Sequence, residues 1–130
     1  MLSPAGMANG LHILAIDNDP WVTTSLGWLF GPPRYRLDTG AGGEAALAAV
    51  KAAAQPFDVI IVDQKMPDLT GAQVVAALRE RRVKSRIIVL SAHLTREIRK
   101  TYEELGVQTM FEKPFDITQL RAAVDAISDA

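Results

Sequence analysis

The stretch FDVIIVDQKMPDLTG, residues 57–71, decides the fold. Its branched aliphatic run, Val59 to Val62, is typical of a strand that lies in a parallel sheet with helices on both faces. Asp63 follows this run directly, and a loop punctuated by Pro67 and Gly71 comes next. In open α/β sheets, ligands bind outside the carboxyl ends of the strands, so an acid at this position indicates a functional edge.

Strand-like and helix-like segments alternate along the rest of the chain. Short runs rich in β-branched or aromatic residues predict strands over 11–16, 35–39, 58–62, 86–90 and 107–111. Periodic apolar or alanine-rich runs predict helices over 20–30, 43–55, 71–82, 95–106 and 116–128. Asp19 is expected to cap the first helix ahead of Pro20, and Asp116 with Gln119 to form a capping box for the last.

Five strand–helix units predict a doubly wound α/β fold. We expect one flavodoxin-like domain over residues 11–130, with a five-stranded parallel sheet of order 2-1-3-4-5. Residues 1–10, MLSPAGMANG, are expected to form a flexible N-terminal extension, because they mix Ser, Pro, Gly and Asn and lack the basic region and apolar stretch of a signal peptide.

The composition excludes several classes of function. The chain has 130 residues and a formal net charge of -1, from 14 basic and 15 acidic residues, which gives no footprint for nucleic acid or a membrane surface. It has no cysteine, so it has no disulfide and no thiolate metal site. No apolar run approaches the ~20 residues of a membrane helix.

Polar residues follow four of the predicted strands. The sequence IDND places Asp17 and Asn18 after the first strand, and Asp63, Ser91 and Lys113 follow the third, fourth and fifth. In the expected strand order these ends converge, and two close carboxylates raise each other's pKa unless a cation joins them. Oxygen donors without His or Cys suit Mg²⁺, while a hydroxyl and an ammonium suit phosphoryl oxygens, so the set predicts aspartyl-phosphate chemistry.

The segments ILAIDND, DVIIVDQKMPDLTG, IIVLSA and EKPF, in this order at four strand ends, resemble the receiver domain of two-component response regulators over residues 11–128. The resemblance implies that Asp63 accepts a phosphoryl group from a histidine kinase or histidine phosphotransfer protein. It further implies a signalling domain that catalyses only its own phosphorylation and dephosphorylation, works in the cytoplasm, and contacts a downstream protein through the face of 95–111 and 116–128.

The resemblance also assigns the other site residues. Asp17, Asn18, Asp63 and the backbone carbonyl of Lys65 are implied as Mg²⁺ contacts. Ser91 is implied as the switch hydroxyl. Lys113 is implied to pair with Asp63 and then with the phosphoryl group, and its bond to Pro114 is usually cis in the family.

Two positions depart from the family pattern. Asn18 replaces the second acid of the metal pair, which predicts weaker Mg²⁺ binding. Met110 replaces the aromatic switch residue, and strand alternation points Phe111 to the opposite face, so coupling to the 95–106 helix is open. His93 and Lys65 lie two residues beyond Ser91 and Asp63 and are hypothesised to tune the lifetime of the phosphoryl group.

Other interpretations remain open at this stage. Asn18 and Met110 favour a pseudo-receiver, a binding module that no longer takes a phosphoryl group. The DND motif also resembles a haloacid-dehalogenase-type phosphatase, although Trp21 stands where that family needs a threonine. We expect Trp21 and Trp28 in the core, or, if exposed, on a kinase-docking face, and we expect Asp68 to be a turn residue.

Overall fold

The computed structural model describes residues 10–128 as an α/β sandwich around one parallel sheet. The strands are β1 (Leu11–Ile16), β2 (Tyr35–Gly40), β3 (Val59–Asp63), β4 (Arg86–Ser91) and β5 (Thr109–Glu112). The helices are α2 (Pro20–Leu29), α3 (Gly43–Ala52), α4 (Gly71–Glu80), α5 (Arg96–Glu104) and α6 (Ile117–Ser128). The strand order β2-β1-β3-β4-β5 confirms the predicted doubly wound topology. Apart from Gly10, the predicted N-terminal extension lies outside the described residues.

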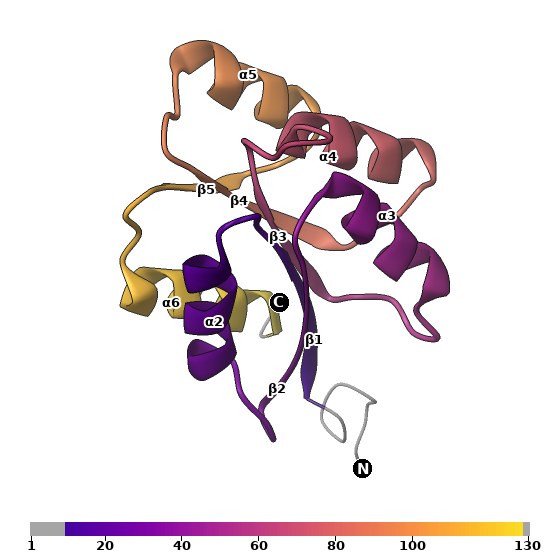
Figure 1. The fold of residues 1–130 in the computed structure, drawn as a ribbon, viewed down its shortest axis with the longest axis vertical. Helices are drawn as coiled ribbons and strands as arrows, with labels where there is room; N and C mark the ends of the chain where they lie inside the picture. The colour runs from indigo at the N-terminus through magenta and orange to yellow at the C-terminus, as the bar shows by residue number, and fades with distance from the viewer. Residues whose placement is uncertain (1–9, 129–130) are drawn as a thin grey trace.

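The helices cover both faces of the sheet. Figure 1 shows α2 and α6 on one face, and α3, α4 and α5 on the other. Each face has its own hydrophobic cluster, because alternate residues of the buried strands point to opposite sides. In β3, for example, Ile60 and Val62 join the cluster under α3, α4 and α5, whereas Val59 and Ile61 join the cluster under α2 and α6.

Two strands have other bounds than the sequence predicts. β3 runs over Val59–Asp63 rather than 58–62, and it extends to Asp63 because this residue still pairs with Leu90 in the ladder with β4. β5 begins at Thr109 rather than 107, because Val107 belongs to the C-terminal turn of α5. Its N–H donates to the carbonyl of Tyr102, beside Gly106 in the left-handed conformation (φ +81°).

The α3 helix ends earlier than predicted, at Ala52 instead of 55. Ala53 adopts extended backbone (φ -66°, ψ 131°) and starts the connection through Pro56 to β3. The N-cap of α2 is Asp19, as predicted, and its side chain accepts from the Trp21 N–H. Among residues 10–128, none of the helices combines the length and apolar character that a membrane crossing requires.

The core prediction for the two tryptophans is wrong. Trp21 is 80% exposed and Trp28 is 86% exposed on the outer side of α2. Leu26 and Phe30 face the sheet in their place, each 1% exposed. Ile117 in the first turn of α6 is also exposed, whereas Leu120 and Val124 supply the contacts with the sheet. Which apolar residues of a helix are exposed is therefore decided by how the helix packs on the sheet.

Gly71 closes the loop that follows Asp63, and the structure shows why a glycine stands there. A Cβ atom at this position would lie 2.5 Å from the carbonyl oxygen of Asp63 and 2.5 Å from the hydroxyl oxygen of Tyr102. The start of α4 thus lies directly against the end of β3, and only glycine permits that approach.

Candidate functional site

Asp17 lies at the carboxyl end of β1 and is almost completely buried. Both of its carboxylate oxygens have partners. Oδ1 accepts from the backbone N–H of Asp19 at 2.9 Å, and Oδ2 accepts from Nζ of Lys113 at 2.8 Å. The turn into α2 and the end of β5 therefore hold this carboxylate from two sides.

Asp63 lies at the end of the neighbouring strand β3 and is also buried. Its Oδ1 atom is 3.3 Å from Nζ of Lys113, so the lysine bridges the two acids. Burial raises the pKa of the Asp63 carboxyl, and the negative charge of Asp17 raises it further, while Lys113 acts in the opposite direction. The structure thus brings Asp17, Asp63 and Lys113 together, as the sequence predicted.

Lys113 follows β5 and reaches over the sheet edge toward β1 and β3. Its backbone N–H donates to the carbonyl of Ser91 at 2.8 Å, and its peptide bond to Pro114 is cis, as the resemblance implied. Burial acts to lower the pKa of the ammonium, but Asp17 and then Asp63 outweigh burial, so the pKa is raised. The lysine therefore stays charged between the two carboxylates.

Ser91 ends β4 at the same edge, but its hydroxyl is directed to the following loop. Its Oγ donates to the carbonyl of His93 at 3.1 Å and accepts from the N–H of His93 at 3.2 Å. The side chain of Ser91 is buried, whereas His93 is exposed. In this structure the hydroxyl is bound within its own loop.

The oxygen donors at this edge fit a hard divalent cation. Two buried carboxylates lie beside each other, Asn18 is exposed next to Asp17, and Lys65 follows Asp63 by two residues. In the described part of the chain no three His, Cys, Asp or Glu side chains gather into a metal-binding group. A divalent cation at this edge would therefore need the amide of Asn18 and the backbone carbonyl of Lys65 in addition to Asp17 and Asp63.

Met110 and Phe111 lie on opposite faces of β5, as strand alternation predicted. Met110 packs with the cluster under α3, α4 and α5, and Phe111 packs with the cluster under α2 and α6. Met110 has no hydroxyl group, so it cannot donate a hydrogen bond to the site.

Sequence reasoning missed the contacts that Asp68 makes with α3. It is more than a turn residue, since its carboxylate accepts from the N–H groups of Gly43, Glu44 and Leu69 at 2.8–2.9 Å. These bonds lower the pKa of Asp68 to about 2. Asp68 thereby ties the loop after Asp63 to the first turn of α3, a contact that spacing along the chain does not reveal.

Sequence reasoning also missed Gln64 and Tyr102. Tyr102 is the buried residue of α5, and its hydroxyl donates to Oε1 of Gln64, the residue directly after Asp63. The sequence signal for Tyr102 was its place in the apolar pattern of the helix, which predicted packing but no polar contact.

The comparisons with known proteins agree with this geometry. The family model described as the response regulator receiver domain matches residues 13–125. The transcriptional regulatory protein TcrA of Mycobacterium tuberculosis is 29% identical over 123 residues, covering 95% of this chain and 48% of that protein. The sporulation initiation phosphotransferase F of Bacillus subtilis is 30% identical over 112 residues, covering 86% of this chain and 89% of that protein. The chain thus spans about half the length of TcrA but most of the phosphotransferase.

Solved structures show the same fold. The chemotaxis protein CheY4 of Vibrio cholerae matches with a TM-score of 0.82 and 27% identity, covering 91% of this chain and 98% of that chain. Neither the family model nor this structure supports the interpretation as a haloacid-dehalogenase-type phosphatase. On the sequence match, the strand order and the convergence of Asp17, Asp63 and Lys113, the chain belongs to the response regulator receiver domain family.

Proposed function

We propose that Asp63 is the phospho-acceptor of this receiver domain. The observation that carries the proposal is the placement of Lys113, whose ammonium lies between the buried carboxylates of Asp17 and Asp63 at the carboxyl edge of the sheet. Asp63 ends the central strand β3, and Nζ of Lys113 lies farther from it, at 3.3 Å, than from Asp17, at 2.8 Å. Asp63 is therefore the acid better suited to act as the nucleophile.

The donor is a phosphohistidine of a histidine kinase or histidine phosphotransfer protein, which are the partners of receiver domains in this family. A carboxylate oxygen of Asp63 forms the new bond to phosphorus, the phosphorus–nitrogen bond breaks, and the imidazole keeps that electron pair. The ammonium of Lys113 would pair with a phosphoryl oxygen. The hydroxyl of Ser91 would have to leave His93 before it could donate to another phosphoryl oxygen.

Asp17, Asn18, Asp63 and the carbonyl of Lys65 would hold Mg²⁺. The bound cation would neutralise phosphoryl oxygens. The domain acts only on its own aspartate, in the cytoplasm, and hydrolysis returns Asp63 to its free form. His93 and Lys65 are both exposed beside the site, so replacing both with small neutral residues should change the phosphoryl lifetime.

The decisive experiment is intact mass spectrometry after incubation with Mg²⁺ and acetyl phosphate, with Asp63→Ala as the control. One phosphoryl adduct that is absent from the control is the expected result. A folded protein that takes no adduct even at high Mg²⁺ would contradict the proposal and favour the pseudo-receiver alternative.

The outer side of α2 supports a docking role toward the phosphodonor. Trp21 and Trp28 are seven residues apart, hence on the same side of the helix, and Pro20–Leu29 contains no charged residue. Trp21 lies in the first turn of α2, close in sequence to Asp17, where a donor must approach. Replacing both tryptophans with alanine should slow phosphotransfer from a histidine kinase but leave labelling by acetyl phosphate unchanged.

A downstream protein is expected to contact the face of 95–111 and 116–128. The outer side of α5 is charged and exposed, with Arg96, Arg99 and Lys100 among its residues. Charge reversal at these three positions should weaken binding of such a partner without changing the adduct on Asp63.

A further inference from the structure

Gln64 stands in the chain between the proposed phospho-acceptor Asp63 and Lys65, whose carbonyl is a proposed metal contact. Three hydrogen bonds, each with a different element, hold Gln64 in place. Its N–H donates to the carbonyl of Leu90 in β4 at 3.1 Å, and its carbonyl accepts from the N–H of Gly71 at 2.9 Å. Its side-chain oxygen accepts from the hydroxyl of Tyr102 in α5. Leu90 and Gly71 therefore hold the backbone beside the acceptor, and Tyr102 holds the side chain of the same residue.

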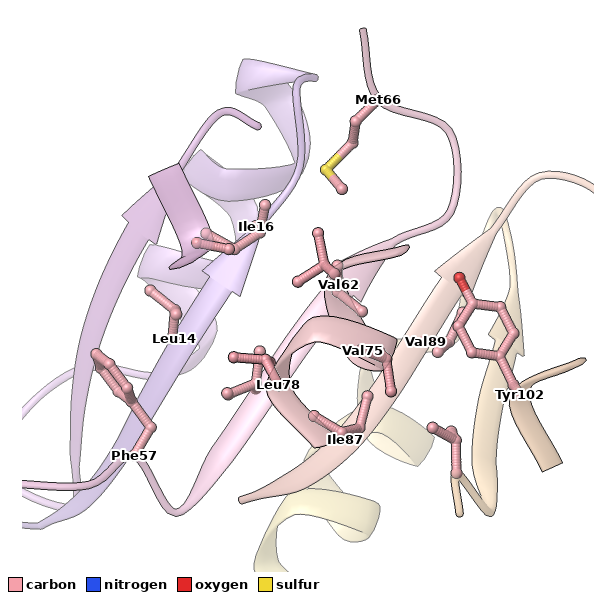
Figure 2. Close-up of a cluster of buried hydrophobic side chains, with 14 residues drawn as sticks. Leu14, Ile16, Phe57, Val62, Met66, Val75, Leu78, Ile87, Val89 and Tyr102 are labelled. Carbon is pink, nitrogen blue, oxygen red and sulfur yellow. The ribbon is translucent and has the colours of Figure 1, made fainter. Parts of the chain in front are cut away.

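Tyr102 is the residue through which α5 is anchored. It is fully buried, whereas Ile98 of the same helix and Leu105 at its C-cap are only partly buried. Figure 2 shows its ring among aliphatic side chains, with the hydroxyl oxygen at the end of the ring nearer the carboxyl ends of the strands. Because the ring is enclosed, α5 cannot shift without moving this hydroxyl.

The hydroxyl also lies close to the acceptor strand itself. A Cβ atom at Gly71 would lie 2.5 Å from the Tyr102 hydroxyl oxygen and 2.5 Å from the carbonyl oxygen of Asp63, so both oxygens border the same small space. Burial, and then the charge of Asp63, raise the pKa of Tyr102 above its usual range. The phenol therefore remains a hydrogen-bond donor throughout the neutral pH range.

We propose that Tyr102 is a positioning residue that couples α5 to the phospho-acceptor site through the hydrogen bond from its hydroxyl to Gln64. The proposal rests on the proposed function of Asp63. Through this bond, the state of Asp63 biases the position of α5. Because coupling between two sites is reciprocal, a partner bound to the exposed side of α5 changes the geometry of residues 63–65 in return.

The coupling requires a side chain that donates a hydrogen bond, and Met110 on β5 has no hydroxyl group to donate. The donor must be a hydroxyl on the cluster under α3, α4 and α5, with an acceptor on the loop after β3. The other tyrosine of the chain, Tyr35, packs in the opposite cluster and donates to Asp125 at 2.7 Å. Tyr35→Phe is therefore a matched control, because it removes a similar hydrogen bond away from the site.

The test uses Tyr102→Phe, Gln64→Leu, the double variant and Tyr35→Phe. The first readout is the backbone amide NMR spectrum of the metal-free protein. We expect each single variant at the pair to shift amides both in residues 63–65 and in α5, and the double variant to add little to either. Tyr35→Phe should leave both regions unchanged.

The second readout is the lifetime of the acetyl-phosphate adduct by intact mass. Tyr102→Phe and Gln64→Leu should each change it several-fold and in the same direction, without additivity. The proposal is overturned if the effects of the two variants add, or if the amides and lifetime match the wild type. If the proposed function is wrong, no protein takes an adduct, including the wild type. In that case the amide shifts alone test whether the hydrogen bond couples α5 to residues 63–65. If Tyr102→Phe fails to fold, Gln64→Leu removes the same bond from the partly buried side.

Discussion

The Nζ atom of Lys113 lies 2.8 Å from Oδ2 of Asp17, nearer than the 3.3 Å that separates it from Oδ1 of Asp63. The lysine thus occupies an oxygen of the acid that is expected to bind the metal. In the metal-free domain it supplies the positive charge that two adjacent buried carboxylates require.

Replacing Lys113 with methionine should therefore tighten Mg²⁺ binding several-fold, because the cation no longer competes with an ammonium for Asp17. The metal-free variant should be less stable than the wild type, since its two carboxylates lose their common partner. Isothermal titration with Mg²⁺ and urea unfolding in EDTA measure the two effects. Weaker Mg²⁺ binding by the variant would contradict the prediction.

Asn18→Asp should also increase Mg²⁺ affinity several-fold, by adding a carboxylate beside Asp17. The same titration measures it, and the metal-free stability should fall because a third negative charge joins the site. An unchanged or reduced affinity would show that position 18 does not contact the metal.

Asp63→Asn should raise the thermal midpoint of the metal-free domain at pH 7 by a few degrees. The pKa of Asp63 is raised in the folded state, so the fold favours the protonated carboxyl group. The stability that this preference contributes is fully present below the unfolded pKa of about 3.9 and is lost as the pH rises through the folded pKa. Asparagine avoids that loss, and Lys113 keeps Asp17 as its partner.

The difference between the two proteins should shrink as the pH falls below the folded pKa of Asp63. Added Mg²⁺ should stabilise the wild type more than the variant. Thermal melts across this pH range test the sign, and a variant less stable than the wild type at pH 7 in EDTA would refute it.

Gly71→Ala should destabilise the domain by about 1–3 kcal/mol, because the new methyl group is forced against the Asp63 carbonyl and the Tyr102 hydroxyl. Gly27→Ala is the control. A Cβ at Gly27 meets no atom within 4 Å, so this variant should gain up to ~1 kcal/mol from helix propensity. Urea unfolding of both variants distinguishes local crowding from a general effect of alanine.

Asp68→Asn should destabilise the domain at pH 6, because three backbone N–H groups lose a charged acceptor. The folded pKa of Asp68 is about 2, below the unfolded value, so its contribution is present above about 3.9 and is lost as the pH falls through the folded pKa. Carbon-detected NMR titration of the carboxyl groups measures this pKa directly. A midpoint at or above 3.9 would show that the contacts with α3 do not form in solution.

Much of the site follows from local sequence. Each of Asp17, Asp63, Ser91 and Lys113 stands directly at or after the end of a strand, and a parallel sheet brings all carboxyl ends to one edge. The apolar runs fix where the strands lie, so the convergence of these residues could be predicted before any distance was known. The N-cap Asp19 was equally local, since its hydrogen bond spans two residues.

Only the tertiary structure decided the contacts between distant segments. Tyr102 and Gln64 are 38 residues apart, and Asp68 reaches Gly43 across 25 residues. Helical periodicity identifies which residues share a side of a helix, but it does not say which side packs. The sequence therefore favoured the core for Trp21 and Trp28 and left an exposed face open, and the structure shows both exposed. The positions of α2 and α5 on the sheet, and therefore the partner that each side chain meets, depend on the packing of all the elements together.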